Sequence, residues 1–212
     1  HARSDGLRAA LQARIDAADA SPRGYDAIAL AYGICGNATI GLRARRRPLV
    51  IPRAHDCCTV LLGSRRRFQE HFQDNPSTPF GSVGYLERGD YYLRLEDGKS
   101  AVHYGDAYAE YVKQYGEENA RYIWETLHPR RAATDDRAVF IDVPETSRLG
   151  AAEKFRARAE AEGKRYVRLE GSLALLRKLI SGPWDPEDIL VVEPGRRIAG
   201  VYDWSEVVRA AD

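Results

Sequence analysis

The sequence predicts an α/β fold with a mostly parallel, doubly wound sheet and helices on both of its faces. Two continuous apolar runs, at 25–33 and 48–52, are typical of strands that are buried on both faces of such a sheet. Strand-like and helix-like segments then alternate at 138–144, 147–163, 164–171, 172–182 and 188–195. This alternation implies right-handed crossovers between parallel strands, and we expect one α/β domain over residues 1–212.

The remaining elements follow from local patterns. Residues 6–20 repeat apolar side chains four positions apart, as an amphipathic helix does. Asp56 can cap a short apolar helix, and Ser64 can start a second, basic helix after it. Residues 75–104 are rich in turn-forming and aromatic residues and predict an irregular insertion, or a hairpin about Glu96-Asp97-Gly98, as a candidate lid. Helical spacing returns at 107–127.

Charge and hydropathy exclude several classes of protein. The chain has 32 basic and 31 acidic residues and a net charge of +1, so no global field favours nucleic acid or an acidic membrane surface. No apolar run approaches the ~18 residues needed to cross a bilayer. Three cysteines, two of them adjacent, make a poor disulfide framework. We expect a soluble, cytoplasmic protein, from which an N-terminal segment is absent because the chain opens at His1 and contains no methionine.

The predicted strands at 25–33 and 48–52 both run into loops that bear cysteine. Cys35 follows the first strand, and His55 and Cys57 follow the second. If the strands are neighbours, the two loops open at the same edge of the sheet, where ligands of such folds bind. Three protein ligands of nitrogen and sulfur type leave a fourth tetrahedral position free, as in a catalytic zinc site. We therefore expect these three residues to be metal ligands.

A metal-free alternative remains open for the same loop. If Asp56 caps a helix, Cys57 lies in its first turn, where exposed N–H groups and the helix dipole favour a thiolate. Arg53 and His55 add positive charge. Cys57 could then be a nucleophile, with His55 as its base.

Further roles are expected for the neighbours of these residues. Arg53, Ser64 and Arg65 would hold a carboxylate or phosphate of a substrate at the helix N-terminus. Asn37 could donate to a developing oxyanion, and Asp56 could orient a ligand or act as an acid or base.

Ordinary packing competes with these functional interpretations. Free cysteine is often buried, and Cys58 precedes an apolar helix, so we expect it in the core. The arginine run at 65–67 is more typical of a solvated helix face. In contrast, burial of His, Asp, Arg and Cys together at one strand end costs free energy, and such a cluster therefore favours a functional site.

Several segments resemble the signature of the uncharacterised DUF1638 family, and the likeness spans most of the chain. They are YGICGN (32–37), PLVIPRAHDC (48–57), LLGSRRRF (61–68), LRAALQARIDAA (7–18) and YGEEN (115–119). We count Tyr32, in the first motif, among the substrate-binding candidates. In the family pattern an aliphatic residue stands at the position of Cys58, which agrees with packing.

The resemblance also carries implications about cofactors and partners. Members tend to begin with an extra strand that bears a cysteine, and nothing here corresponds to it. Cysteines from successive strand ends could hold an iron–sulfur cluster in place of zinc. Family genes often accompany corrinoid-dependent methyltransferases, which implies one-carbon metabolism and a corrinoid methyltransferase system as a partner.

These observations together favour a zinc-dependent transferase or hydrolase that acts on a small polar substrate. The alternative is an accessory protein of corrinoid metabolism that binds a metal, a cluster or a cofactor without turnover.

Overall fold

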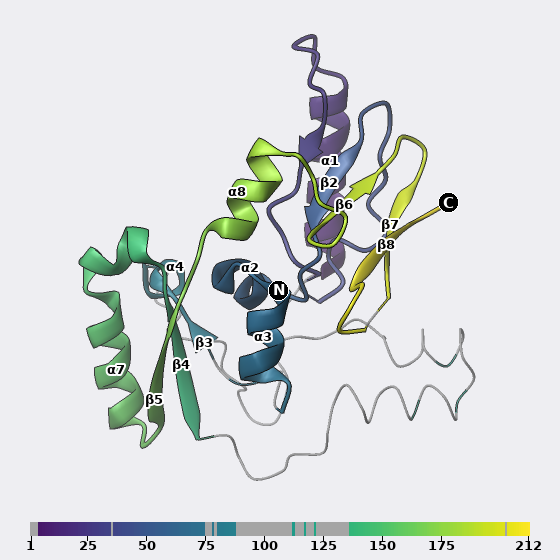
Figure 1. Ribbon diagram of the computed structural model, residues 1–212. Coiled ribbons are helices and arrows are strands. Elements are labelled where there is room, and N and C mark those ends of the chain that lie inside the picture. The colour runs from purple at the N-terminus through teal and green to yellow at the C-terminus, as the bar shows by residue number, and fades with distance from the viewer. Residues whose placement is uncertain are drawn as a thin grey trace.

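The computed structural model describes residues 4–34, 36–74, 78, 80–87, 112, 117, 121, 136–201 and 203–212 (Figure 1). Its helices are α1 (Ser4–Asp19), α2 (Cys57–Leu62), α3 (Arg65–Phe72), α4 (Val83–Glu87), α7 (Ala151–Ala161) and α8 (Ala174–Ser181), with a 3₁₀ helix at Pro144–Leu149. Its strands are β1 (Ile28–Ala29), β2 (Leu49–Pro52), β3 (Phe80–Gly81), β4 (Arg137–Asp142), β5 (Arg165–Glu170), β6 (Ile189–Val192), β7 (Arg197–Gly200) and β8 (Val208–Ala211). Among these residues, no helix is both long and apolar enough to span a membrane.

One sheet is entirely parallel and has the strand order β3-β4-β5. Successive side chains of β4 lie on opposite faces. Ala138 and Phe140 pack in a core with α7, whereas Val139 and Ile141 pack in a second core with α2 and α3. Figure 1 shows α7 on one side of this sheet and α2 and α3 on the other. Because both faces are buried, the strand is a continuous apolar run, and the predicted α/β class with flanking helices is confirmed.

A second sheet is mixed and has the order β1-β2-β6. Leu49 and Ile51 pack in a core with α1, whereas Val50 packs with α8 on the other face. β1 is parallel to β2, but β6 is antiparallel to it, with Leu49 opposite Val192.

The predicted doubly wound, mostly parallel sheet is therefore not confirmed. The segment 188–195 does contain a strand, as expected, but this strand runs antiparallel in the second sheet. The reason is physical: an apolar run reports that both faces of a strand are buried, whichever way the strand runs. In β6, Val192 packs in the core with α1 and Ile189 packs in the core with α8. Sequence alone does not distinguish the two directions.

The predicted insertion at 75–104 is partly regular. Phe80 and Gly81 form a strand that pairs in parallel with β4, and α4 follows directly. The expectation of irregular structure fails there, because a strand of two residues is too short for a periodic pattern. Residues 88–104 lie outside the described residues, as does the helix predicted at 107–127 apart from three positions.

The β7–β8 hairpin is a feature that the sequence patterns do not predict. Ile198 and Val208 pack in the core of α1 and the mixed sheet. Trp204, in the connection between the strands, packs instead on the core of the parallel sheet. The hairpin therefore contacts both cores.

Helix α2 also lies between the two cores. Cys58 and Leu62 pack with β4, whereas Val60 packs with β2 and α8. The helix ends at Gly63, whose φ of 71° is left-handed. A Cβ atom on Gly63 would lie 2.8 Å from the Cβ atom of Ser172, so glycine is required by conformation and by space.

Gly63→Ala should destabilise the fold by about 2 kcal/mol or more, because alanine is strained at positive φ and would collide with Ser172. The measurement is urea unfolding of the native chain and the variant. Gly84→Ala is the matched control, since nothing lies within 4 Å of a Cβ atom there. It should be neutral or stabilise α4 by up to about 1 kcal/mol. Equal effects of the two changes would contradict the close contact at Gly63.

Candidate functional site

The two cysteine-bearing loops lie side by side, as the sequence predicts. After the parallel strands β1 and β2, the backbone N–H of Ile34 donates to the carbonyl oxygen of Ala54 at 3.0 Å. Gly33 lies directly against Asp56, so that a Cβ atom on Gly33 would be 2.7 Å from the Asp56 Cα atom. The absence of a side chain at Gly33 thus permits the close approach of the loops. Cys35 itself lies outside the described residues.

Asp56 is the N-cap of α2, which confirms the predicted start of this helix. Its backbone is extended, and Oδ1 accepts hydrogen bonds from the backbone N–H of Thr59 at 3.0 Å and from Thr59 Oγ1 at 3.3 Å. Burial raises the pKa of Asp56 to about 6, although the bonds from Thr59 act in the opposite direction. The carboxyl group therefore changes its charge close to neutral pH.

His55 is enclosed by aromatic rings. Its ring centroid lies 5.5 Å from that of Phe68, in a stacked arrangement, and 5.2 Å from that of Trp204, edge to face. Burial, and then the positive charge of Arg65, lower the pKa of His55 to about 4, so the imidazole is neutral at pH 7. Its Nε2 atom is buried and has no hydrogen-bond partner among the residues that the structure describes. Such an atom is uncommon in a folded protein and needs an explanation.

The two adjacent cysteines have different environments. Cys58 is fully buried in the core with Leu62 and Val139, so its predicted packing role is confirmed. Burial raises the pKa of the Cys58 thiol well above its ordinary value. Cys57 is only partly buried, and its Sγ atom lies 2.8 Å from Tyr85 Oη. Of the two thiols, Cys57 is the one suited to chemistry.

Tyr85 and Trp204 are site residues that the sequence patterns do not reveal, and Tyr85 contacts the sulfur of Cys57. Tyr85 lies on α4, directly after β3, in the segment where an irregular insertion is predicted. No local pattern connects it with Cys57, because the two residues are 28 positions apart and lie on helices that follow strands of different sheets.

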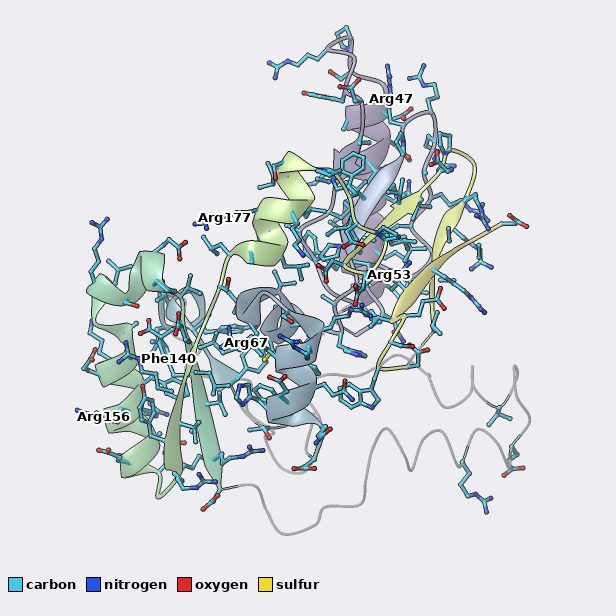
Figure 2. The ribbon with its side chains drawn as sticks, viewed as in Figure 1. Arg47, Arg53, Arg67, Phe140, Arg156 and Arg177 are labelled. Carbon is cyan, nitrogen blue, oxygen red and sulfur yellow. The ribbon has the colours of Figure 1, made fainter. Side chains whose placement is uncertain are left out.

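Arg53 joins the end of β2 to two other segments. Its Nε donates to the carbonyl oxygen of Pro186 at 2.8 Å, and its Nη1 donates to those of Glu206, at 2.9 Å, and Val208. Figure 2 shows Arg53 between β2 and the β7–β8 hairpin. Burial lowers the pKa of its guanidinium. These contacts give Arg53 a structural role, and its anion-binding role stays a prediction.

Ser64 and Arg65 begin α3. Ser64 Oγ accepts from the backbone N–H of Arg67 at 3.4 Å, which confirms Ser64 as the predicted start of this helix. Arg65 Nη2 donates to the carbonyl oxygen of Glu187. The Nε atom of Arg65 is buried and has no partner within the described residues. Arg65 is therefore better placed than Arg53 to donate a hydrogen bond to a bound anion.

The other substrate-side candidates lie in the loop after β1. Asn37 is buried and has a left-handed φ of 64°, and its carbonyl oxygen accepts from Arg8 Nη2 at 2.8 Å. Tyr32 is exposed. Both residues belong to the loop of Ile34, whose backbone N–H bonds to Ala54, and their roles at the site stay predictions.

Among the described residues, no group of three or more His, Cys, Asp and Glu side chains is arranged to hold a metal ion. The expected set of Cys35, His55 and Cys57 includes a residue outside this range and stays a prediction. The described residues supply three groups. They are the neutral imidazole of His55 with a buried nitrogen that has no partner among them, the thiol of Cys57 beside the hydroxyl of Tyr85, and the carboxyl group of Asp56, whose pKa is about 6.

The pH dependence of stability tests the protonation states of His55 and Asp56. The pKa of His55 falls from 6.5 to about 4 on folding. The contribution of His55 to the free energy of unfolding is therefore complete above pH 6.5 and is lost as the pH falls towards 4. The pKa of Asp56 rises from 3.8 to about 6 on folding. The contribution of Asp56 to the free energy of unfolding is therefore complete below pH 3.8 and is lost as the pH rises towards 6. The two effects oppose each other in the native chain.

We therefore expect the two substitutions to have opposite effects in chelator-treated protein. As the pH falls from 6.5 to 4, Asp56→Asn should lose on the order of 2 kcal/mol of unfolding free energy relative to the native chain, because it lacks the stabilising protonation of Asp56. Asparagine retains the N-cap. His55→Gln should gain unfolding free energy relative to the native chain as the pH falls over the same interval, because it lacks the group that resists protonation in the folded state. Urea unfolding across this range measures both, and variants that keep the native pH dependence would show that the protonation states are assigned wrongly.

A family model described as "Protein of unknown function (DUF1638)" matches residues 1–180 of the 212 in the chain. No curated protein and no solved structure matches. The matched range includes both loops of the site, α2 and Tyr85, but not Trp204. The chain belongs to the DUF1638 family.

Proposed function

We propose that the chain is a metal-dependent enzyme that acts on a small polar substrate, with its metal held by Cys35, His55 and Cys57. The observation that carries this proposal is the neutral His55, whose buried Nε2 atom has no partner among the described residues. Metal ions bind the neutral form of imidazole, and a bound ion would satisfy this nitrogen. Zinc is the proposed metal, and an iron–sulfur cluster is the alternative.

The arrangement of the loops supports the proposal. The hydrogen bond from Ile34 to Ala54 joins the chain on the N-terminal side of Cys35 to the chain before His55. Cys57 is the first residue of α2, where the helix dipole favours a thiolate. Imidazole nitrogen and thiolate sulfur are donors that zinc prefers.

The metal and the residues around it would each have a separate role in activating, binding and orienting the substrate. Zinc with three such ligands would supply a Lewis acid with one open position, for water or for a substrate thiolate. The buried Nε–H of Arg65 would donate to an anionic group of the substrate. Asp56 would orient the ligands that flank it or transfer a proton.

Metal content is the direct test. We expect stoichiometric zinc in the native protein, and its loss in His55→Ala and Cys57→Ala because each change removes a ligand. The measurement is elemental analysis after aerobic and anaerobic purification, and iron with a brown colour would favour the cluster instead.

Two neighbouring changes serve as matched controls. Cys58→Ala removes the adjacent cysteine, which packs in the core, and His71→Ala removes a histidine on α3. Both should keep the native metal content, with folding checked by circular dichroism. A Cys57→Ala protein that retains its metal would refute the proposed ligand set.

A second candidate function is a metal-free enzyme with Cys57 as nucleophile and His55 as base. It is favoured by the contact of Cys57 Sγ with Tyr85 Oη, since a hydrogen bond donated by the hydroxyl group would stabilise a thiolate. This candidate requires that iodoacetamide label Cys57 stoichiometrically and that chelators leave the labelling unchanged. Labelling that appears only after chelation would instead support the metal.

A further inference from the structure

Tyr85 enters the candidate site from a distant part of the fold. Its Oη atom lies 2.8 Å from Cys57 Sγ. Cys57 begins the helix that follows β2, and Tyr85 lies on the helix that follows β3. The contact therefore joins the carboxyl ends of two strands that belong to different sheets.

We propose that Tyr85 is a positioning residue, which donates a hydrogen bond to the sulfur of Cys57 and holds it in the orientation that the site uses. Either atom can be the donor in the neutral pair, but a thiolate can only accept. The proton therefore belongs to Tyr85 whenever the sulfur is deprotonated, whether as a metal ligand or as a nucleophile. This inference rests on the proposed function of Cys57.

The rest of the Tyr85 side chain is held by the parallel sheet. Its ring lies edge to face with Phe80 of β3, with centroids 5.7 Å apart, and packs on the core that contains Val139. Its backbone N–H donates to the carbonyl oxygen of Ser82 at 3.1 Å. The ring is thus fixed by packing independently of the hydroxyl group, and Tyr85→Phe should remove the donor while the ring keeps its place.

The expected effect follows from the role of hydrogen bonds to metal ligands. Loss of such a partner typically weakens metal binding by about 10- to 100-fold. We expect this loss of zinc affinity in full-chain Tyr85→Phe, together with a shifted sulfur-to-metal charge-transfer band when cobalt replaces zinc. Tyr166→Phe is the matched control, because Tyr166 packs on the opposite face of the parallel sheet with Phe155. It should leave both readouts unchanged.

The outcomes separate this inference from the proposed function. Native zinc affinity and spectrum in Tyr85→Phe, with binding abolished in Cys57→Ala, would overturn the role of Tyr85 and leave the metal site intact.

If the native chain binds no metal, the proposed metal site fails and alkylation decides the role of Tyr85. A hydrogen bond to the sulfur favours the thiolate, so at a fixed pH near neutral iodoacetamide should label Cys57 about threefold more slowly in Tyr85→Phe than in Tyr166→Phe. Equal labelling rates would overturn the inference.

Discussion

The burial of α2 between two apolar cores is the constraint on which both the fold and the site depend. This helix has only six residues, too few to be stable without tertiary packing. Its position is set from both ends, where Gly33 lies against Asp56 and Gly63 lies against Ser172. Because the helix is fixed between the sheets, its first residue, Cys57, lies beside an element that follows β3. The carboxyl ends of strands from both sheets thereby meet at one place.

Asp56 stabilises α2 as its N-cap, but two features of the polar groups at this place reduce the free energy of unfolding. Asp56 has a raised pKa, so burial of its charge at neutral pH is unfavourable for the native state. His55 leaves a buried nitrogen without a partner among the described residues. An apolar ring could fill the position of His55 without this cost, and groups of this kind gather where a protein binds or reacts. The chemistry of the loop is therefore better explained by function than by stability.

Arginine side chains provide much of the cross-linking around the site. In the run at 65–67, each guanidinium has a different environment: Arg66 pairs with Glu70 at the surface, Arg67 donates to the carbonyl oxygens of Leu62 and Glu170, and Arg65 donates to that of Glu187. The planar guanidinium can bridge several carbonyl oxygens at once. The interpretation of this run as a solvated helix face therefore holds for Arg66, whereas its neighbours hold segments together.

By itself, the sequence determined the features that depend on neighbouring residues. Asp56 and Ser64 cap helices because their side chains bond to N–H groups three positions away. The apolar run at 48–52 identified the buried strand β2, and the apolar helix after Asp56 identified the core position of Cys58. The run at 25–33 was misleading, because only Ile28 and Ala29 form a strand there and neither residue is fully buried. Only the tertiary structure decided which way β6 runs and which groups meet Cys57 and His55. Periodicity reports whether a residue is buried, not which partner covers it, so the roles of Tyr85 and Trp204 emerge only when the chain is folded.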